Sequence, residues 1–142
     1  MRPMMSREEV EAFLDREFPQ IHQDGRVYLV ERVGDLTACL RLRAGPRHIR
    51  PGGTLSGPSL MTLADLGLYV AILANIGPVG LAVTTNLNFN FLRRSEPRDV
   101  LAECRLLKLG QRLAVGEVTI RQDGSDDAIC HATGTYSIPP RL

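Results

Sequence analysis

One carboxylate stands alone in a long apolar stretch of the sequence. The segment from 57 to 77 reads GPSLMTLADLGLYVAILANIG, and Asp65 is its only charged residue. Removing a carboxylate from water is costly unless the group is paired, hydrated or used in chemistry. A carboxylate in such a place can take a proton from water or attack a carbonyl carbon. Asp65 is therefore the first candidate for a chemical role.

A single long helix positions Asp65. Pro58 suits its first turn because proline lacks the N–H that is not needed there, and Ser56 or Gly57 would cap it. Gly77-Pro78 ends the helix, which leaves roughly 18 residues, or about 27 Å. A helix that is apolar all round is usually buried on most sides. Its apolar side chains are Leu60, Met61, Leu63, Leu66, Leu68, Val70, Ile72 and Leu73.

The rest of the chain is predicted to form a short helix and several strands that can enclose this helix. Ser6-Arg7-Glu8-Glu9 is a capping box, and apolar spacing then predicts a short helix over 7–18. A loop rich in Arg, Gly and Pro is expected over 44–53. Alternating apolar and polar residues predict six strands, at 26–33, 36–43, 81–92, and about 99–108, 112–121 and 128–138.

The order of these elements defines the fold class. The connections between the late strands are too short for parallel crossovers, so the sheet should be antiparallel. We therefore expect an α+β protein in which one antiparallel sheet wraps around the long central helix. Residues 1–142 form a single domain, and no repeat or linker divides them.

Composition excludes several function classes. The net charge of +1 gives no general reason to expect nucleic-acid binding. The apolar run 60–74 contains a charge and is short for a membrane span, and the charged N-terminus does not read as a signal peptide. Cys39, Cys104 and Cys130 are odd in number, so we expect reduced thiols in a cytoplasmic protein. No Cys/His spacing suggests a metal site.

Four stretches resemble the hotdog-fold acyl-CoA thioesterases, and most of all the PaaI-like group of the phenylacetate pathway. They are RPGGTLSGPSLMTLAD, VTTNLNFNFLRR, RLAVGEVTIRQDG and ATGTYSIP, within a match from about Val27 to Pro139. The resemblance implies a hotdog fold and a homodimer with its active site at the interface. Dimers of this family commonly pair into tetramers. It also implies a coenzyme A thioester as substrate, with no further cofactor.

The family pattern carries over only in part. A His-Gly-Gly motif at the start of the helix, with an acid two turns later, falls on Ser56-Gly57-Pro58 and Asp65. A Ser/Thr of the following strand falls on Thr84, and an asparagine before the helix falls on Arg50. Gly57 and Asp65 keep the pattern, whereas Pro58 removes one possible backbone donor.

These positions define the catalytic candidates. Asp65 would act as base or nucleophile, and the Gly57 N–H at the positive helix end would polarise the thioester carbonyl. The Thr84 hydroxyl would hold the water or the carboxylate. Each residue also has a simpler explanation: a structural carboxylate, a turn glycine and an ordinary strand threonine.

The substrate-binding candidates are Arg50, Ser56, Asn86, Arg93 and Arg94. Arg50 would bind a carboxylate on the acyl group, pair with Asp65 or contact a phosphate of coenzyme A. Arginine suits phosphate by its bidentate geometry. Asn86 alternates with two further asparagines onto one sheet face, at the dimer seam or the mouth of the pocket. The side chains expected to shape the acyl pocket are Leu63, Leu66, Tyr69 and Phe89 or Phe91.

The function expected from these residues is acyl-CoA thioester hydrolysis. The alternative is a non-catalytic acyl-CoA binding protein, which the altered helix start favours. A hydratase of this fold would carry a histidine five residues after the acid, where Val70 stands. A transcriptional regulator would need a DNA-binding domain, and the roughly 25 residues before the first strand are too few. The acyl group and the tetramer geometry remain open.

Overall fold

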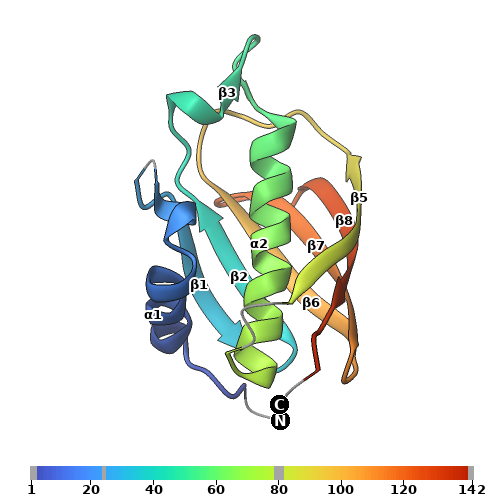
Figure 1. The fold of residues 1–142 in the computed structure, drawn as a ribbon. Helices are drawn as coiled ribbons and strands as arrows, with labels where there is room; N and C mark the ends of the chain where they lie inside the picture. The colour runs from blue at the N-terminus through green and yellow to red at the C-terminus, as the bar shows by residue number, and fades with distance from the viewer. Residues whose placement is uncertain (1–2, 24, 79–81, 141–142) are drawn as a thin grey trace.

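A six-stranded antiparallel sheet curls around one long helix (Figure 1). The computed structural model describes residues 3–23, 25–78 and 82–140. The sheet order is β1-β2-β6-β7-β8-β5, and α2 lies in its concave face. The predicted hotdog architecture is confirmed. The strands are β1 (Tyr28–Gly34), β2 (Thr37–Leu42), β5 (Val83–Phe91), β6 (Val100–Leu109), β7 (Leu113–Gln122) and β8 (Ala128–Ser137).

The helices also follow the sequence closely. The central helix α2 spans Gly57–Ile76 with Ser56 as its N-cap, and α1 spans Arg7–Glu17 with the predicted capping box in place. Residue 81, the first of the strand predicted over 81–92, lies outside the described residues. The prediction of a loop over 44–53 is wrong in part, because short regular elements lie within it. That stretch contains η2 (Pro46–His48) and the strand β3 (Ile49–Arg50), which pairs with β4 (Thr54–Leu55).

Two facing glycines let α2 lie deep in the sheet. Gly116 of β7 and Gly134 of β8 are partners across the ladder, and Leu68 packs over both. A Cβ on Gly116 would lie 2.6 Å from Leu68 Cδ2, and one on Gly134 would lie 2.8 Å from Leu68 Cδ1. On the helix itself, a Cβ on Gly67 would collide with Cys104 Sγ. Leu68 is thus held between two positions where any side chain would push the helix outward.

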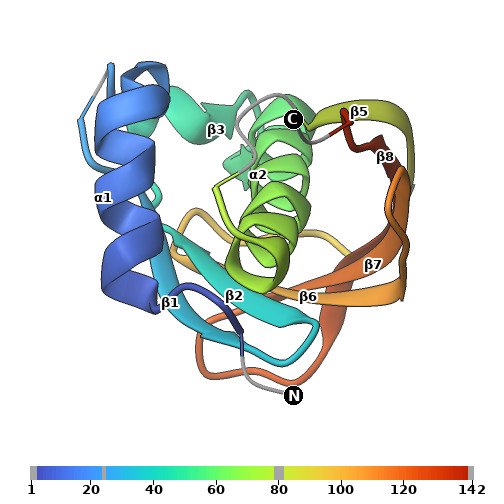
Figure 2. The same cartoon turned by 60° about the horizontal axis from the view of Figure 1, so that its bottom comes forward.

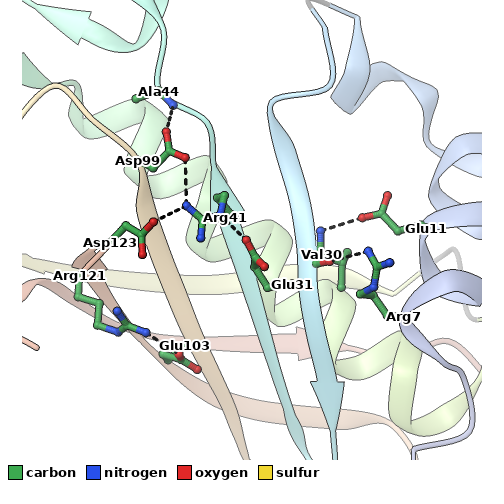
Figure 3. Close-up of polar contacts among 10 residues, drawn as sticks. All are labelled: Arg7, Glu11, Val30, Glu31, Arg41, Ala44, Asp99, Glu103, Arg121 and Asp123. Atoms are coloured by element: carbon green, nitrogen blue, oxygen red, sulfur yellow. Dashed lines mark hydrogen bonds and ion pairs between the residues drawn. The ribbon is translucent and has the colours of Figure 1, made fainter. Parts of the chain in front are cut away.

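One edge of the sheet is capped by the N-terminal helix. α1 lies beside β1 (Figure 2). The Val30 N–H donates to Glu11 Oε1 at 2.7 Å, and Arg7 Nη1 donates to the Val30 carbonyl at 3.2 Å (Figure 3). Free strand edges invite pairing with other chains. These two side chains therefore occupy backbone groups that another strand would need, whereas β5, at the opposite edge, is largely exposed.

An arginine fastens the segment that leads from β2 toward α2. The Arg41 guanidinium contacts the carboxylates of Glu31, Asp99 and Asp123 (Figure 3). The second oxygen of Asp99 accepts a hydrogen bond from the Ala44 N–H at 3.1 Å. The hydrogen bond and positive charge of Arg41 lower the pKa of Asp123. The end of β2 is thereby tied to β1 on one side and, on the other, to Asp99 before β6 and Asp123 after β7.

By length and composition α2 would be able to cross a membrane, but 72% of its most apolar window is buried inside the protein. It is the core helix that the sheet encloses. Such a helix passes the same test in a soluble protein, so its composition is weak evidence for a span.

Replacing Gly134 by alanine is expected to destabilise the protein by about 1–3 kcal/mol, the usual cost of overpacking a core. The new methyl group would meet Leu68 and Leu87 side-chain atoms, both 2.8 Å away. Urea unfolding would measure the change. Thr133→Ala is the matched control, because Thr133 is the preceding residue and is exposed. Equal stability of the two variants would contradict the tight packing of Leu68.

Candidate active site

Asp65 accepts hydrogen bonds from two hydroxyl groups of the sheet. It lies on the third turn of α2 and is half-buried. Thr84 Oγ1 donates to Asp65 Oδ1 at 2.7 Å. The Tyr136 hydroxyl also contacts Oδ1 and lies 2.7 Å from the Asp65 carbonyl oxygen. The predicted pair of Asp65 and Thr84 is thus brought together, and Tyr136 joins it.

Tyr136 is a site residue that sequence reasoning missed. On β8 every second side chain faces α2, and the inward series ends with Gly134 and Tyr136. The motif ATGTYSIP contained that signal, since a tyrosine two residues beyond a core-facing glycine on a strand must face the same way. Burial, followed by the nearby Asp65 carboxylate, raises the pKa of Tyr136 above its usual value. The phenol therefore stays protonated and donates its hydrogen bond.

Both hydroxyls engage the same carboxylate oxygen. In the part of the chain that the structure describes, no hydrogen bond reaches Asp65 Oδ2. Oδ2 therefore keeps its lone pairs for a ligand. A carboxylate held through one oxygen and open at the other can take a proton from water or attack an electrophilic carbon.

A largely apolar cavity of about 730 Å³ opens beside Asp65. This volume lies within the range of small-molecule sites. The predicted pocket residues Leu66 and Tyr69 line it, whereas Leu63 is fully buried in the core and Phe89 stacks on Phe91. The unpredicted contribution comes from the N-terminal segment. The lining consists of Phe13, Glu17, Phe18, Ile21, Thr62, Asp65, Leu66, Tyr69, Pro78, Ala82, Val83, Thr84 and Tyr136.

The start of α2 forms a second chemical feature. Ser56 Oγ accepts from the Ser59 N–H at 3.2 Å and lies 2.7 Å from Ser59 Oγ, so its side chain serves as the cap. Pro58 has no N–H. Within the described ranges, no hydrogen bond engages the Gly57 N–H, which sits at the positive end of the helix dipole. Gly57 thus presents a free backbone donor.

Gly57 and Asp65 of one chain are too far apart to act on one carbonyl group. They are eight residues apart in the same helix, a rise of about 12 Å. A donor and a base that serve the same carbonyl must each lie about 3 Å from the reacting atoms. A single chain therefore contains both the Gly57 N–H and the Asp65 carboxylate, but the two cannot act on the same carbonyl group.

The remaining candidates lie away from the cavity. Arg50 is exposed on β3, and Asp65 is held by hydroxyls instead of by Arg50. Arg94 Nη2 donates to the Gly52 carbonyl and Arg93 Nη1 to the Ala128 carbonyl, both at 2.7 Å. These contacts bring Arg94 against the β3–β4 hairpin, near the start of α2.

Asn86 lies on the outer face of the sheet, opposite Thr135. In a regular strand it would share a face with Thr84, two residues earlier. A β-bulge between Thr84 and Asn86 changes the register, so Thr84 pairs with the inward-facing Tyr136 while Asn86 faces away. Neither the bulge nor this consequence is evident from the sequence.

Comparison with known proteins identifies the family of this chain. Residues 52–129 match the thioesterase superfamily. A protein of Pseudomonas aeruginosa named as a candidate esterase, PA0474, is 33% identical over 99 residues, which cover 69% of this chain and 72% of that protein. The crystal structure of a candidate thioesterase from Silicibacter sp. TM1040 is 41% identical, with a TM-score of 0.88 over 99% of this chain and 96% of the other.

A more distant structure shares the fold. A variant of the phenylacetic acid degradation protein PaaI from Thermus thermophilus is 22% identical, with a TM-score of 0.69 over 79% of this chain and 93% of that one. The chain belongs to the thioesterase superfamily. It is a hydrolase of PaaI-like hotdog fold, and its general reaction is thioester hydrolysis.

Removing either hydroxyl from Asp65 is expected to lower kcat more than it changes KM. Tyr136→Phe and Thr84→Val each remove a hydrogen bond to a carboxylate, a contribution of about 1.5 kcal/mol, or roughly tenfold in rate. Steady-state thioesterase kinetics would measure the effect. Thr135→Val is the control, because Thr135 is adjacent in sequence and pairs with the outward-facing Asn86. Unchanged kcat in both site variants would show that neither hydroxyl orients Asp65 during turnover.

Proposed function

We propose that this protein hydrolyses acyl-CoA thioesters with Asp65 as base or nucleophile, at a site that two copies of the chain share. The observation that carries the proposal is Asp65 itself. It is a half-buried carboxylate, held through one oxygen by Thr84 and Tyr136, on the wall of an apolar cavity. A carboxylate with only a structural role would not require a second oxygen that is left without hydrogen bonds beside a cavity.

As general base, Asp65 Oδ2 takes a proton from a water molecule while the water oxygen bonds to the thioester carbon. The carbonyl oxygen becomes an oxyanion, which a backbone N–H at a helix start stabilises. Collapse of this intermediate breaks the carbon–sulfur bond, and the departing thiolate receives the proton. The products are a carboxylic acid and free coenzyme A.

As nucleophile, Asp65 would instead bond directly to the thioester carbon and displace the thiolate. The resulting mixed anhydride is then cleaved by water, which restores the carboxylate. Both routes need the same open carboxylate oxygen and the same oxyanion donor. The hydroxyls of Thr84 and Tyr136 keep Oδ2 pointed at the substrate in either route.

A second copy would supply the oxyanion donor. The about 12 Å rise between Gly57 and Asp65 along α2 keeps one chain from using both on one substrate. α1 caps one edge of the sheet, whereas β5 is exposed and carries apolar side chains at its ends, with Val83 55% and Phe91 54% accessible. We propose that β5 strands of two copies pair edge to edge and that such dimers assemble into tetramers.

The basic residues near the start of α2 suit the coenzyme A phosphates. Arg94 lies against the β3–β4 hairpin that carries Arg50, and Arg93 is its neighbour. All three are exposed, and arginine binds phosphate through two parallel hydrogen bonds. Coenzyme A is then part of the substrate, and we propose no separate cofactor. The free, buried Cys39, Cys104 and Cys130 suit the reducing cytoplasm, our proposed location.

Asp65→Asn is expected to keep the fold and the oligomeric state but to lower turnover by at least about a hundredfold, the scale of a positioned base. Free-thiol release from acetyl-, medium-chain, phenylacetyl- and dicarboxylic acyl-CoAs would measure it. The dicarboxylic substrates should be the poorest, because Glu17 and Asp65 both line the cavity.

Two outcomes would contradict this assignment. Full activity in Asp65→Asn would remove Asp65 from the mechanism. Tight binding of acyl-CoA by the wild type without hydrolysis of any thioester would instead support the non-catalytic binding alternative, with Ser56 and Pro58 as the reason.

Phe91→Asp is expected to turn the proposed dimer into a monomer, since it places a charge on the exposed edge strand. Sedimentation velocity at micromolar concentration would measure the mass. Leu113→Asp is the control, because Leu113 is also an exposed apolar residue, 41% accessible, but lies at the start of β7. A wild-type monomer with full activity would refute the shared site.

A further inference from the structure

Two cavities meet at the segment that follows α1. The first is the cavity beside Asp65. The second has a volume of about 380 Å³. Phe18, Ile21 and Thr62 line both, so these three residues form the partition. The second cavity is completed by Gln20, Gly25, Val27, Tyr28, Arg47 and His48.

Phe18 lies in the turn after α1 and lines the first cavity. α1 ends at Glu17, Phe18 leaves helical geometry with φ −139° and ψ 54°, and Pro19 begins the short helix η1 (Pro19–His22). The Phe18 ring packs edge-on against the ring of Tyr69, with centroids 6.1 Å apart and planes at 88°. This arrangement is a favourable geometry for an aromatic pair. It holds the Phe18 ring in the lining that the two cavities share.

We propose that Phe18, supported by Ile21, is the specificity-determining residue that sets the maximum length of the acyl group. The inference rests on the proposed function, because it takes the cavity beside Asp65 as the acyl site. The acyl class is then an uncharged, apolar group that ends at the Phe18 ring. A longer chain would have to separate Phe18 from Tyr69 before it reached the second cavity.

The surroundings of Phe18 support a role in substrate selection more than in folding. Phe18 is 37% exposed, whereas Tyr69 beneath it and the nearby Phe13 are buried. Loss of a partly exposed ring creates little cavity in the core, so a smaller side chain is compatible with the fold.

The test compares Phe18→Ala with the wild type on butanoyl-, octanoyl- and dodecanoyl-CoA. Opening the partition is expected to raise the ratio of kcat/KM for dodecanoyl over butanoyl by about tenfold or more, since each added methylene in an apolar site contributes to discrimination. Leu113→Ala is the control, because Leu113 is similarly exposed but borders neither cavity. Phe18→Trp should shift the ratio in the opposite direction.

A second readout separates this inference from the catalytic proposal. Dissociation constants of non-hydrolysable S-alkyl-CoA thioethers of the same lengths should show the same shift in Phe18→Ala. Hydrolysis with an unchanged length preference in both Phe18 variants would overturn the role of Phe18 and leave the thioesterase proposal standing. If the wild type hydrolysed nothing, a shift in thioether affinity would still support the partition, and the lack of one would overturn it.

Discussion

The depth at which Leu68 sits in the sheet is the constraint on which the rest of the structure depends. Gly116 and Gly134 face each other beneath it and have no side chain to hold the helix away. Asp65 precedes Leu68 by one helical turn, and Tyr136 follows Gly134 by two residues on β8. The hydrogen bond between Asp65 and Tyr136 therefore forms only because the helix and the sheet approach so closely. Packing and site geometry are fixed by the same contact.

The two edges of the sheet have different properties. The side chains of Arg7 and Glu11 take up the backbone groups of Val30 at one edge. At the other edge the backbone of β5 is open and Thr84 faces inward to Asp65. The strand that completes the carboxylate's hydrogen bonds is thus also the one available to a second copy. In the proposed dimer, assembly and the geometry around Asp65 are therefore linked through β5.

Much of this arrangement could be predicted from the sequence, because periodicity and caps are local signals. The apolar helix around Asp65, the capping box of α1 and the alternating strands all appeared where expected. The partner of Asp65 on β8 was missed, since contact between residues 71 positions apart is not a local property. The bulge that turns Asn86 away from Thr84 was also invisible, because it depends on the register with β8.

The part of the cavity wall that α1 and η1 form can change independently of the residues around Asp65. Its residues, from Phe13 to Ile21, come from one short stretch of the sequence, whereas Asp65, Thr84 and Tyr136 come from three elements of the core. Substitutions in this one short segment can reshape the space beside Asp65 without moving a reacting group. In the proposed site, the space for the substrate can therefore change through this segment while Asp65, Thr84 and Tyr136 stay the same.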